Sequence, residues 1–490
     1  MNRHRPIAAT YRLVALLLAI SAALAACQTV TLPQAQETPR PGTPLAATPR
    51  PGPRTPAPAV PPSATPTQTE VPEHMLVDPQ DLRGLEIAFW YPWSGEAVPV
   101  IESMVADFNR ENVWGVRVTA RSTGGGSEMY WEVATARAAD AAPDVIAAPP
   151  DLLHYWDTQQ MVADLTDYES NPDWGFSADE IADFYPAFYQ QDRAEGRQIG
   201  IPAERSARVL FYNKSWAREL GFDQPPATPA EFERQACAAA QALLVDPGRE
   251  NDGLGGWIVN RDAMTMLSWM AAFGGAPAEE TGGALRFNSR ESAQAFEYIR
   301  SLFDQGCAWN SRDPLPYDYF ATRRALFYTG SPDQVRAQVW AMTRANNSDQ
   351  WGLVPFPSED GTPALVASGF SYGILRSTPE RQLAGWLFIR HMLLTRNQVR
   401  LVEANHSLPV SQSAQAALTN FASRNPEWAA ALELVPDAVQ AARVPGAWWA
   451  ASGVLEDATW QMLQVLTPVP AETILQQADQ IVPEMLEHAP

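Results

Sequence analysis

The sequence predicts an α/β protein in which two domains follow a leader that has no core of its own. Between residues 85 and 148, runs of β-forming residues alternate with runs whose apolar residues recur at helical spacing. About 400 residues follow the leader, and this length suits two domains better than one. The chain is 46% hydrophobic and 10% aromatic, so it can form a sizeable core.

Residues 1–26 predict a signal peptide. Three arginines precede an apolar run at 13–20, and small residues follow that run. The sequence Leu-Ala-Ala-Cys at 24–27 resembles the lipobox of bacterial lipoproteins, which implies that Cys27 carries lipid and becomes the first mature residue. An ordinary cleaved signal or a single membrane helix is the alternative, although the run is short for a span of about 20 residues.

Residues 27–75 predict a disordered linker. Pro, Thr, Ala and Gln dominate the segment, which repeats Thr-Pro and Arg-Pro-Gly units and has few large apolar residues. Such a composition cannot bury enough apolar surface to offset the conformational entropy lost on folding. We therefore expect a stalk that holds the folded head, residues 82–490, away from a membrane.

The head opens with a predicted βαβαβ unit, which indicates a parallel sheet with helices on its faces. Its expected elements are strands at 85–90, 116–120 and 144–148, and helices at 98–109 and 127–139. Ligands of such sheets gather at the loops that follow the carboxyl ends of the strands. The candidate binding loops are therefore 90–96, 121–126 and 149–151.

A second group of elements follows residue 199. A strand is expected at 207–213, and a helix begins at Pro229, because Thr228 and Glu231 have the spacing of a capping box. Largely helical sequence continues to about residue 304. Further expected elements are strands at 325–328 and 351–354, a Gly-rich segment at 367–374, and helices over most of the remainder.

Several segments in this order resemble the family 1 extracellular solute-binding proteins, the sugar-binding lipoproteins of bacterial ABC importers, of which maltose-binding protein is one. The resemblance spans the whole head. It rests on FWYPWSG at 89–95, APDV at 142–145, GIP at 200–202, VLFYNK at 209–214, LGFDQPPATPAEF at 220–232, the region of Gly369, the helix at 384–394 and SLPV at 407–410.

The resemblance implies a type II periplasmic-binding-protein fold, in which two α/β lobes enclose a ligand cleft. We expect lobe one at about 82–190 plus part of 320–375, and lobe two at about 200–310 plus 376–490. Ligand would bridge the lobes and favour a closed form. The monomeric head would then deliver its sugar to the membrane permease of an ABC transporter, outside the cytoplasm and without chemical change.

Trp side chains in loops or at segment ends are expected to stack on the sugar, because the C–H faces of a sugar match a flat aromatic ring. Charged and polar groups would fix its hydroxyls. Glu204 and Arg205 follow the GIP crossing, where cleft residues are expected, although a surface ion pair is equally consistent. The expected ligand-binding residues are Trp93, Ser94, Asp151, Glu204, Arg205, Tyr212, Trp257, Ser331, Gly369, Arg443, Trp448 and Trp449.

Two other functions remain as alternatives. Arg443, Ser331 and Gly369 could instead form a phosphate pocket, so glycerol-3-phosphate or a related phosphodiester is the second candidate ligand. Gly369 to Gly373 also matches G-x-S-x-G, the motif of a hydrolase with Ser371 as nucleophile. That motif requires a helix directly after the serine, and the sequence predicts continued strand there.

Other classes of function have no support in the sequence. A formal net charge of −21 argues against a nucleic-acid partner, which requires a basic face. No Walker A motif and no dinucleotide fingerprint occurs, so we expect no cofactor. No Cys-x-x-Cys motif or His/Cys cluster predicts a metal site. Cys237 and Cys307 either pair as a disulfide or remain as two buried thiols.

Overall fold

The computed structural model describes residues 75–275, 278–279, 285–311, 315–434, 448–464 and 469–487. All of these belong to the second of two compact units, residues 69–490. The predicted signal peptide, the predicted lipidation site Cys27 and nearly all of the predicted linker lie outside the described residues, as does Arg443. No helix within the described ranges has the length and apolar character needed to cross a membrane.

The first sheet has the strand order β2-β1-β3-β14-β6. β1 pairs in parallel with β2 and β3, whereas β14 runs antiparallel to both of its neighbours. The sheet is therefore mixed rather than wholly parallel, because β14 comes from a distant part of the chain. The strands are β1 (Glu86–Tyr91), β2 (Arg117–Ser122), β3 (Val145–Ala148), β6 (Ile201–Ala207) and β14 (Ala367–Ile374).

Helices cover both faces of this sheet, and β3 shows why. All four of its residues are buried, because alternate side chains enter two different cores. Val145 and Ala147 pack with α1 and α13, while Ile146 and Ala148 pack with α2 and α3. The helices are α1 (Ala97–Glu111), α2 (Gly126–Ala138), α3 (Pro150–Thr158), α13 (Pro379–Met392) and α14 (Thr395–Asn405).

The second sheet has the order β11-β8-β12-β7-β13 and is also mixed. β8 pairs in parallel with β11 and β12, and β7 runs antiparallel to β12 and β13. The strands are β7 (Val209–Asn213), β8 (Trp257–Val259), β11 (Ala308–Asn310), β12 (Phe327–Gly330) and β13 (Trp351–Val354). Its helices include α8 (Pro229–Leu244), α9 (Ala263–Ala272), α10 (Arg290–Asp304), α11 (Tyr317–Ala321), α12 (Val335–Arg344), α18 (Trp448–Met462) and α19 (Ala471–Glu487).

The start of α8 follows the predicted capping pattern with one change. Thr228 Oγ1 accepts a hydrogen bond from the backbone N–H of Glu231 at 3.3 Å. The Glu231 carboxylate reaches back to the N–H of Ala227 rather than to that of Thr228. The helix therefore begins where the sequence predicts. The Glu231 carboxylate accepts from the backbone N–H of Ala227, one residue before the N-cap Thr228.

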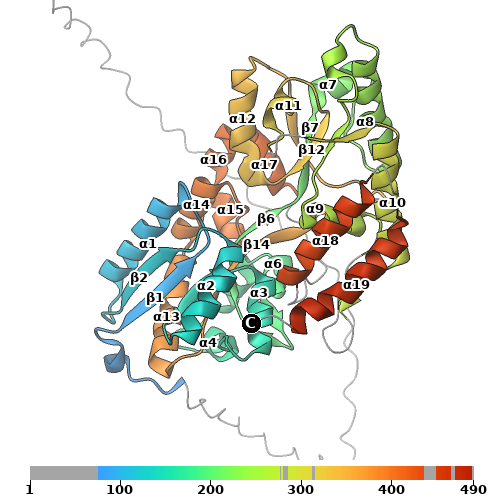
Figure 1. Cartoon of the computed structure of the whole chain (residues 1–490). Helices are drawn as coiled ribbons and strands as arrows, with labels where there is room; N and C mark the ends of the chain where they lie inside the picture. Colours follow the sequence, from blue (N-terminus) through green and yellow to red (C-terminus); the bar gives the residue numbers. More distant parts are fainter. Residues whose placement is uncertain are drawn as a thin grey trace, which may run out of the picture. The chain divides into compact units, whose positions relative to one another are not determined.

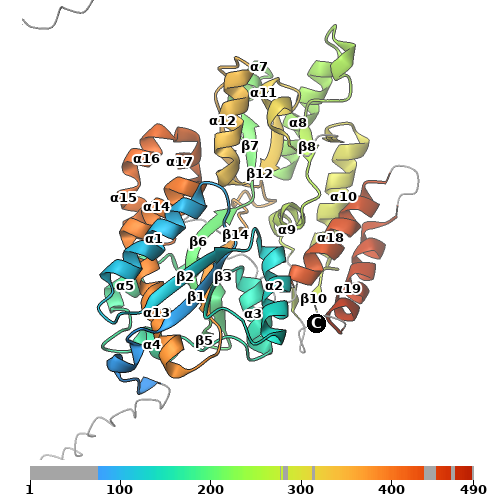
Figure 2. The ribbon, with the colours of Figure 1, turned by 60° about the vertical axis from the view of Figure 1, so that its left-hand side comes forward.

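The chain crosses between the sheets more than once. β6 runs directly into β7 through Arg208, and β14 returns to the first sheet after β13. The predicted lobe boundaries differ from this arrangement after residue 375. We expected residues 376–490 in the second lobe, but α13 and α14 contact elements of the first sheet. Later in this stretch, α17 (Pro426–Leu432) contacts β13 of the second sheet, and α18 and α19 pack against α9 and α10, where Figures 1 and 2 show α18 and α19 side by side.

The remaining elements are short. They are α4 (Thr166–Ser170), α5 (Ala178–Asp183), α6 (Pro186–Tyr189), α7 (Lys214–Glu219), α15 (Gln412–Ala417), α16 (Thr419–Arg424), α17 (Pro426–Leu432), the hairpins β4 (Arg193–Ala194) with β5 (Arg197–Gln198) and β9 (Ala278–Glu279) with β10 (Leu285–Arg286), and 3₁₀ turns at Pro79–Leu82, Gln190–Asp192, Arg249–Asn251 and Pro332–Gln334. A disulfide joins Cys237 in α8 to Cys307, which lies just after α10 rather than within a helix.

Candidate ligand-binding site

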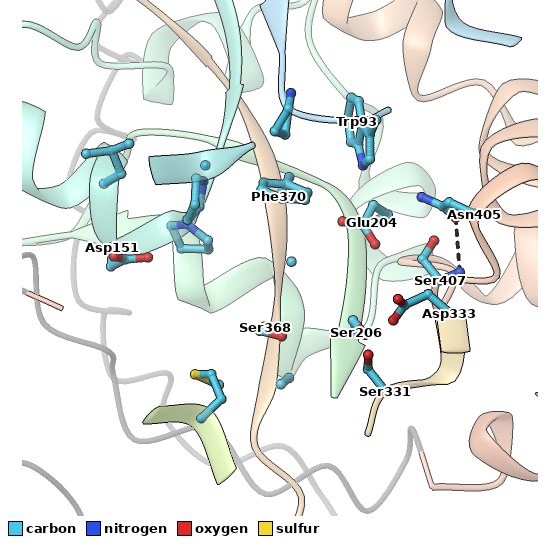
Figure 3. Close-up of a pocket in the computed structure, with 18 of the residues that line it drawn as sticks. Trp93, Asp151, Glu204, Ser206, Ser331, Asp333, Ser368, Phe370, Asn405 and Ser407 are labelled. Atoms are coloured by element: carbon cyan, nitrogen blue, oxygen red, sulfur yellow. Dashed lines mark hydrogen bonds between the residues drawn. The ribbon is translucent and has the colours of Figure 1, made fainter. Parts of the chain in front are cut away.

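A pocket of about 980 Å³ lies where the two sheets meet (Figure 3). Both sheets contribute to it, through β6, β14, the segments that follow β1 and β3, and the turn that follows β12. Its lining comprises Pro92, Trp93, Ser94, Ala97, Gly126, Tyr130, Trp131, Pro149, Pro150, Asp151, Leu152, Gln191, Glu204, Ser206, Arg208, Met264, Ser331, Asp333, Ala367, Ser368, Gly369, Phe370, Asn405, Ser407, Trp448 and Ser452.

The topology of the first sheet explains the position of the pocket. β1, β2 and β3 are parallel, so the loops after their carboxyl ends meet at one edge. All three predicted binding loops contribute residues to the lining, at 92–94, at Gly126 and at 149–151. Gly126 begins α2 and Pro150 begins α3, so the amino ends of two helices reach the pocket.

Glu204 is a buried acid of the pocket whose ionisation is strongly affected by its surroundings. The residue lies on β6 and is only 4% exposed. The pKa of its carboxyl is raised to about 7, mainly by burial; Arg205 opposes the rise, the nearby Asp333 carboxylate adds to it, and Ser407 and Trp93 oppose it. Figure 3 shows the carboxylates of Glu204 and Asp333 at the same end of the pocket. The Glu204 carboxyl therefore tends to hold a proton, or to accept a hydrogen bond from a donor of the ligand.

Three polar atoms in the lining lack a hydrogen-bond partner within the described part of the chain. They are Trp93 Nε1, Ser206 Oγ and Ser407 Oγ. Trp93 and Ser407 approach Glu204 closely enough to lower its pKa, yet neither makes a bond of normal geometry. Buried donors of this kind are costly unless they are satisfied, so they are suited to bind polar groups of a ligand.

Aromatic rings supply the apolar part of the lining. Trp93 packs edge-on against Phe370 with ring centroids 5.7 Å apart, and both face the pocket in Figure 3. Trp131 lies on α2 and is 58% exposed, so it offers a ring to a ligand without a change in the core. Trp448 is the first residue of α18 and lines the pocket from the second sheet. Rings beside unpartnered polar atoms are the usual make-up of a small-molecule site.

The charge of the described lining is negative. Asp151, Glu204 and Asp333 contribute carboxylates, and Arg208 is the one cationic side chain among the described lining residues. Arg208 Nε donates to Asp262 Oδ1 at 3.1 Å, and its guanidinium forms an ion pair with the same carboxylate. The described part of the pocket thus offers no unpaired cation to an anionic ligand.

The structure brings seven of the twelve predicted ligand-binding residues to this pocket. They are Trp93, Ser94, Asp151, Glu204, Ser331, Gly369 and Trp448. Trp449 belongs to α18, next to Trp448, but its side chain is not among those described, and Arg443 lies outside the described residues altogether.

The other three predicted ligand-binding residues lie in the core instead. Arg205 is fully buried, and its guanidinium pairs with Asp192 at 3.1 Å and donates to Ser371 Oγ at 3.0 Å. Its remaining N–H groups donate to Gln191 and to backbone carbonyls, so all of its donor directions are occupied by protein. The surface ion pair considered as an alternative is not found either, because its partner is the buried Asp192.

Trp257 and Tyr212 are buried by the second sheet. Trp257 is 0% exposed on β8, and its Nε1 donates to Thr329 Oγ1 at 3.2 Å. Tyr212 stacks on Phe327 with ring centroids 4.9 Å apart. The sequence around Trp257 is rich in glycine, which suggests a loop, but β8 is an inner strand that pairs on both edges, and all three of its residues are buried.

Sequence reasoning did not select Trp131, Asp333, Asn405 or Ser407. Trp131 follows the Gly-rich part of a predicted binding loop, residues 124–126, and this position could have indicated that it lines the pocket. Ser407 belongs to the SLPV segment, whose Leu408 pairs with Arg205, so β6 holds it beside Glu204. Ser407 N donates to Asn405 Oδ1 at 3.0 Å, the bond drawn in Figure 3. The pairing of Leu408 with Arg205 joins segments about 200 residues apart, which local patterns do not reveal.

Ser371 does not occupy a nucleophile elbow. It lies inside β14, which continues to Ile374, and α13 begins only at Pro379. The serine is fully buried and its Oγ accepts a hydrogen bond from Arg205. The strand-to-helix turn that exposes a catalytic serine is therefore missing at this motif.

Comparisons with solved structures show the same fold. MalE, the sugar-binding protein of Xanthomonas citri, matches with a TM-score of 0.70 and 22% identity, over 82% of this chain and 98% of that one. The cyclic α-maltosyl-1,6-maltose binding protein of Arthrobacter globiformis matches with a TM-score of 0.63 and 20% identity, over 83% and 100%. UgpB of Mycobacterium tuberculosis, solved with glycerophosphocholine, matches with a TM-score of 0.64 and 18% identity, over 82% of this chain and 98% of that one. The predicted two-lobed α/β fold is thereby confirmed.

Sequence comparison gives the family. A probable ABC transporter-binding protein of Deinococcus radiodurans is 26% identical over 130 residues, which cover 26% of this chain and 30% of that relative. The chain thus matches less than a third of that relative's length. A family model described as bacterial extracellular solute-binding protein matches residues 103–457. Because this match spans well over half of the chain, the protein belongs to the bacterial extracellular solute-binding proteins.

Proposed function

We propose that this protein captures a carbohydrate in the pocket between its two sheets and delivers it to the membrane permease of an ABC importer. As a member of an extracellular family, it acts outside the cytoplasm. Ligand that contacts both sheets favours a closed arrangement of the lobes, because only that arrangement completes its contacts. The permease would then receive the closed, loaded form, and the sugar would pass on unchanged.

The composition of the pocket is the observation that carries this proposal. Aromatic rings supplied by Trp93, Trp131 and Trp448 lie in the same lining as unpartnered donors and carboxylates. A sugar needs both kinds of contact, since its C–H faces stack on rings while its hydroxyls donate to and accept from polar groups. Proteins of similar fold, among them the sugar-binding protein MalE and a cyclic α-maltosyl-1,6-maltose binding protein, point to the same class of ligand.

A phosphodiester ligand is less well supported. The structural likeness to UgpB favours it, but the described lining has three carboxylates against one arginine that is already paired. Arg443, which lies outside the described residues, is the cation that the sequence suggests for such a ligand. If the ligand were a phosphodiester, Arg443→Ala would cost roughly 2–5 kcal/mol of binding, because a charge-assisted pair would be lost from a desolvated site. We expect this substitution to be nearly neutral.

The protein is expected to bind without catalysis. The relatives named above are binding proteins, and Ser371 is fully buried within a strand. Ligand recovered after overnight incubation should therefore be chemically unchanged. Turnover of a sugar or an ester that disappears in Ser371→Ala would overturn this part of the proposal.

We also propose that Cys27 anchors the protein to the outer face of the bacterial membrane through lipid, with residues 27–75 as the stalk. The lipobox-like sequence at 24–27 behind an apolar run supports this. In a detergent-phase extraction, the wild-type protein should enter the detergent phase, and Cys27→Ser should not. Wild-type protein found wholly in the aqueous phase would contradict the anchor.

A thermal-shift screen tests the ligand class. Ligand that binds only the native state raises the melting temperature by mass action, by an amount that corresponds to about 2.7 kcal/mol at one hundred times Kd. A panel of mono- and oligosaccharides and of glycerol phosphates should give shifts with sugars. Shifts with the phosphates alone would replace the carbohydrate by the phosphodiester ligand.

A further inference from the structure

The carboxylates of Glu204 and Asp333 form a negative subsite at one end of the pocket. Glu204 projects from β6 of the first sheet, and Asp333 projects from the turn Pro332–Gln334 that follows β12 of the second. The Asp333 carboxylate disfavours ionisation of Glu204 and so raises the pKa of its carboxyl. Arg208 is the one cationic side chain of the described lining, and it is already paired with Asp262.

Arg205, the residue next to Glu204, does not neutralise the subsite by direct contact. Its guanidinium points into the core, where it binds Asp192, Ser371 and the carbonyl of Phe370. It lowers the pKa of Glu204 only through space, and this effect is smaller than that of burial. A nearly buried carboxylate thus faces the pocket with a second carboxylate nearby and no cation in contact.

Unpartnered buried atoms at the same place indicate that a ligand completes the subsite. Trp93 is 6% exposed and Ser407 is 3% exposed, and Trp93 Nε1 and Ser407 Oγ, which both approach the Glu204 carboxyl, make no hydrogen bond of normal geometry within the described residues. Figure 3 shows both side chains directed toward the space beside Glu204. These two hydrogen-bond donors lie next to the carboxyl groups of Glu204 and Asp333, which accept. Such a set would fit a ligand that carries hydroxyl groups and a positively charged hydrogen-bond donor.

We propose that the ligand is an amino sugar whose protonated amine binds between Glu204 and Asp333, an inference that rests on the proposed capture of a carbohydrate. The ammonium group would donate to both carboxylates and favour the ionised form of Glu204. A neighbouring hydroxyl would accept from Trp93 Nε1 or Ser407 Oγ. A neutral sugar could satisfy the hydrogen bonds, but it would bring no positive charge to the Asp333 carboxylate or to the Glu204 carboxyl in a partly desolvated site.

The aromatic residues of the subsite support a cationic group. Trp93 and Phe370 pack edge-on beside Glu204, and a cation near a ring face is attracted by the ring electrons. A metal ion fits less well, because the described residues contain no group of three or more His, Cys, Asp or Glu side chains that could hold one. An organic cation needs fewer ligands, since its own carbon skeleton occupies the rest of the pocket.

The test compares sugars that differ only in the amine. Glucosamine and its β-1,4-linked dimer and trimer are titrated calorimetrically at pH 6.5 against glucose, cellobiose and cellotriose. We expect the amino form to bind at least tenfold more tightly in one or more of the three pairs. In Asp333→Asn the ratio of the two affinities should fall to threefold or less. Asp333 is exposed, so this variant is expected to fold normally.

Two further variants separate the subsite from general charge. Glu204→Gln removes the buried carboxylate and should reduce the affinity ratio in the same way, provided that its circular dichroism matches that of wild type. Glu359→Gln makes the same charge change at an exposed residue that is absent from the described lining, and it should leave the ratio unchanged. A ratio that falls equally in Glu359→Gln would mean that net charge attracts the amine, which overturns the subsite.

The two proposals fail in different ways. Neutral sugars that bind as tightly as their amino counterparts would overturn the amino-sugar inference and leave carbohydrate capture intact. An amine preference that survives both Asp333→Asn and Glu204→Gln would also overturn it, because the amine would then bind elsewhere. If neither these sugars nor those of the thermal-shift panel bind, both the inference and the proposed function are wrong.

Discussion

Glu96 and Arg336 form an ion pair between the segment that follows β1 and helix α12, which belongs with the second sheet. Both side chains are largely exposed. Each partner of the pair follows a residue of the pocket lining closely in the sequence. Glu96 lies two residues after Ser94, and Arg336 lies three residues after Asp333. It therefore joins the two sides that a bound ligand would also join.

Loss of this pair should weaken ligand binding without loss of any ligand contact. Arg336→Gln removes an attraction that is present only when the two sides are close, so affinity should fall roughly two- to fivefold, in line with exposed ion pairs. The effect should shrink at 0.5 M salt. Arg344→Gln is the matched control, since it breaks an equally exposed pair with Asp318 between α12 and α11 on one side. Equal losses in both variants would contradict a role across the pocket.

Trp131 offers a test of stacking that leaves the core intact. It lines the pocket but is 58% exposed, so Trp131→Ala should cost about 1–3 kcal/mol of sugar binding and little stability. Trp340 on α12 is 66% exposed and absent from the described lining, and Trp340→Ala should leave binding unchanged. Calorimetry of both variants with one sugar checks this. Normal affinity in Trp131→Ala would mean that the ring does not contact ligand.

Glu204 should make the stability of the ligand-free protein depend on pH. Below the pKa of 4.5 of an unperturbed carboxyl, Glu204 is protonated in both the folded and the unfolded chain. Between about 4.5 and 7 the unfolded chain ionises while the folded protein keeps the proton. The stability of wild type relative to Glu204→Gln should therefore fall by roughly 3 kcal/mol as pH rises across this range, and then level off.

Urea unfolding of both proteins at several pH values measures this difference. The comparison with Glu204→Gln cancels the contributions of other titrating groups to a first approximation. A difference that is constant between pH 4.5 and 7.5 would show that the carboxyl titrates at an ordinary pKa in the folded protein.

Trp257 should behave as a core residue. It is fully buried among Phe232 and Trp269, with ring centroids 5.9 and 5.6 Å away. Trp257→Ala should destabilise the protein by about 3–5 kcal/mol, because it creates a cavity in the second sheet. Trp257→Phe should retain most of the stability and bind sugar normally. Weaker sugar binding by a stably folded Trp257→Phe would instead support the sequence-based prediction that Trp257 contacts the ligand.

The first βαβαβ unit could be predicted almost to its boundaries. The helix expected at 98–109 is α1 (Ala97–Glu111), and the strand expected at 144–148 is β3 (Val145–Ala148). Local periodicity suffices here, because each element of the unit packs on its neighbours in the chain. The loops after the strands, and with them Trp93 and Asp151, follow from the parallel order.

The rest of the site depends on contacts between distant segments. Trp257 and Trp131 both lie near glycines in the sequence, yet one is enclosed by the second sheet and the other is exposed at the pocket. Ser407 faces Glu204 only because Leu408 pairs with Arg205. The assignment of α13 to the first sheet likewise follows from its packing on β14 and β1, which composition does not encode.

Small-angle X-ray scattering of the head, with and without saturating sugar, tests the central claim most directly. If ligand binds between the two sheets and favours a closed arrangement, the radius of gyration should decrease on binding. It should return to its starting value when the sugar is removed by dialysis, because no bond is made or broken. A sugar that binds by calorimetry and leaves the scattering curve unchanged would contradict capture by closure.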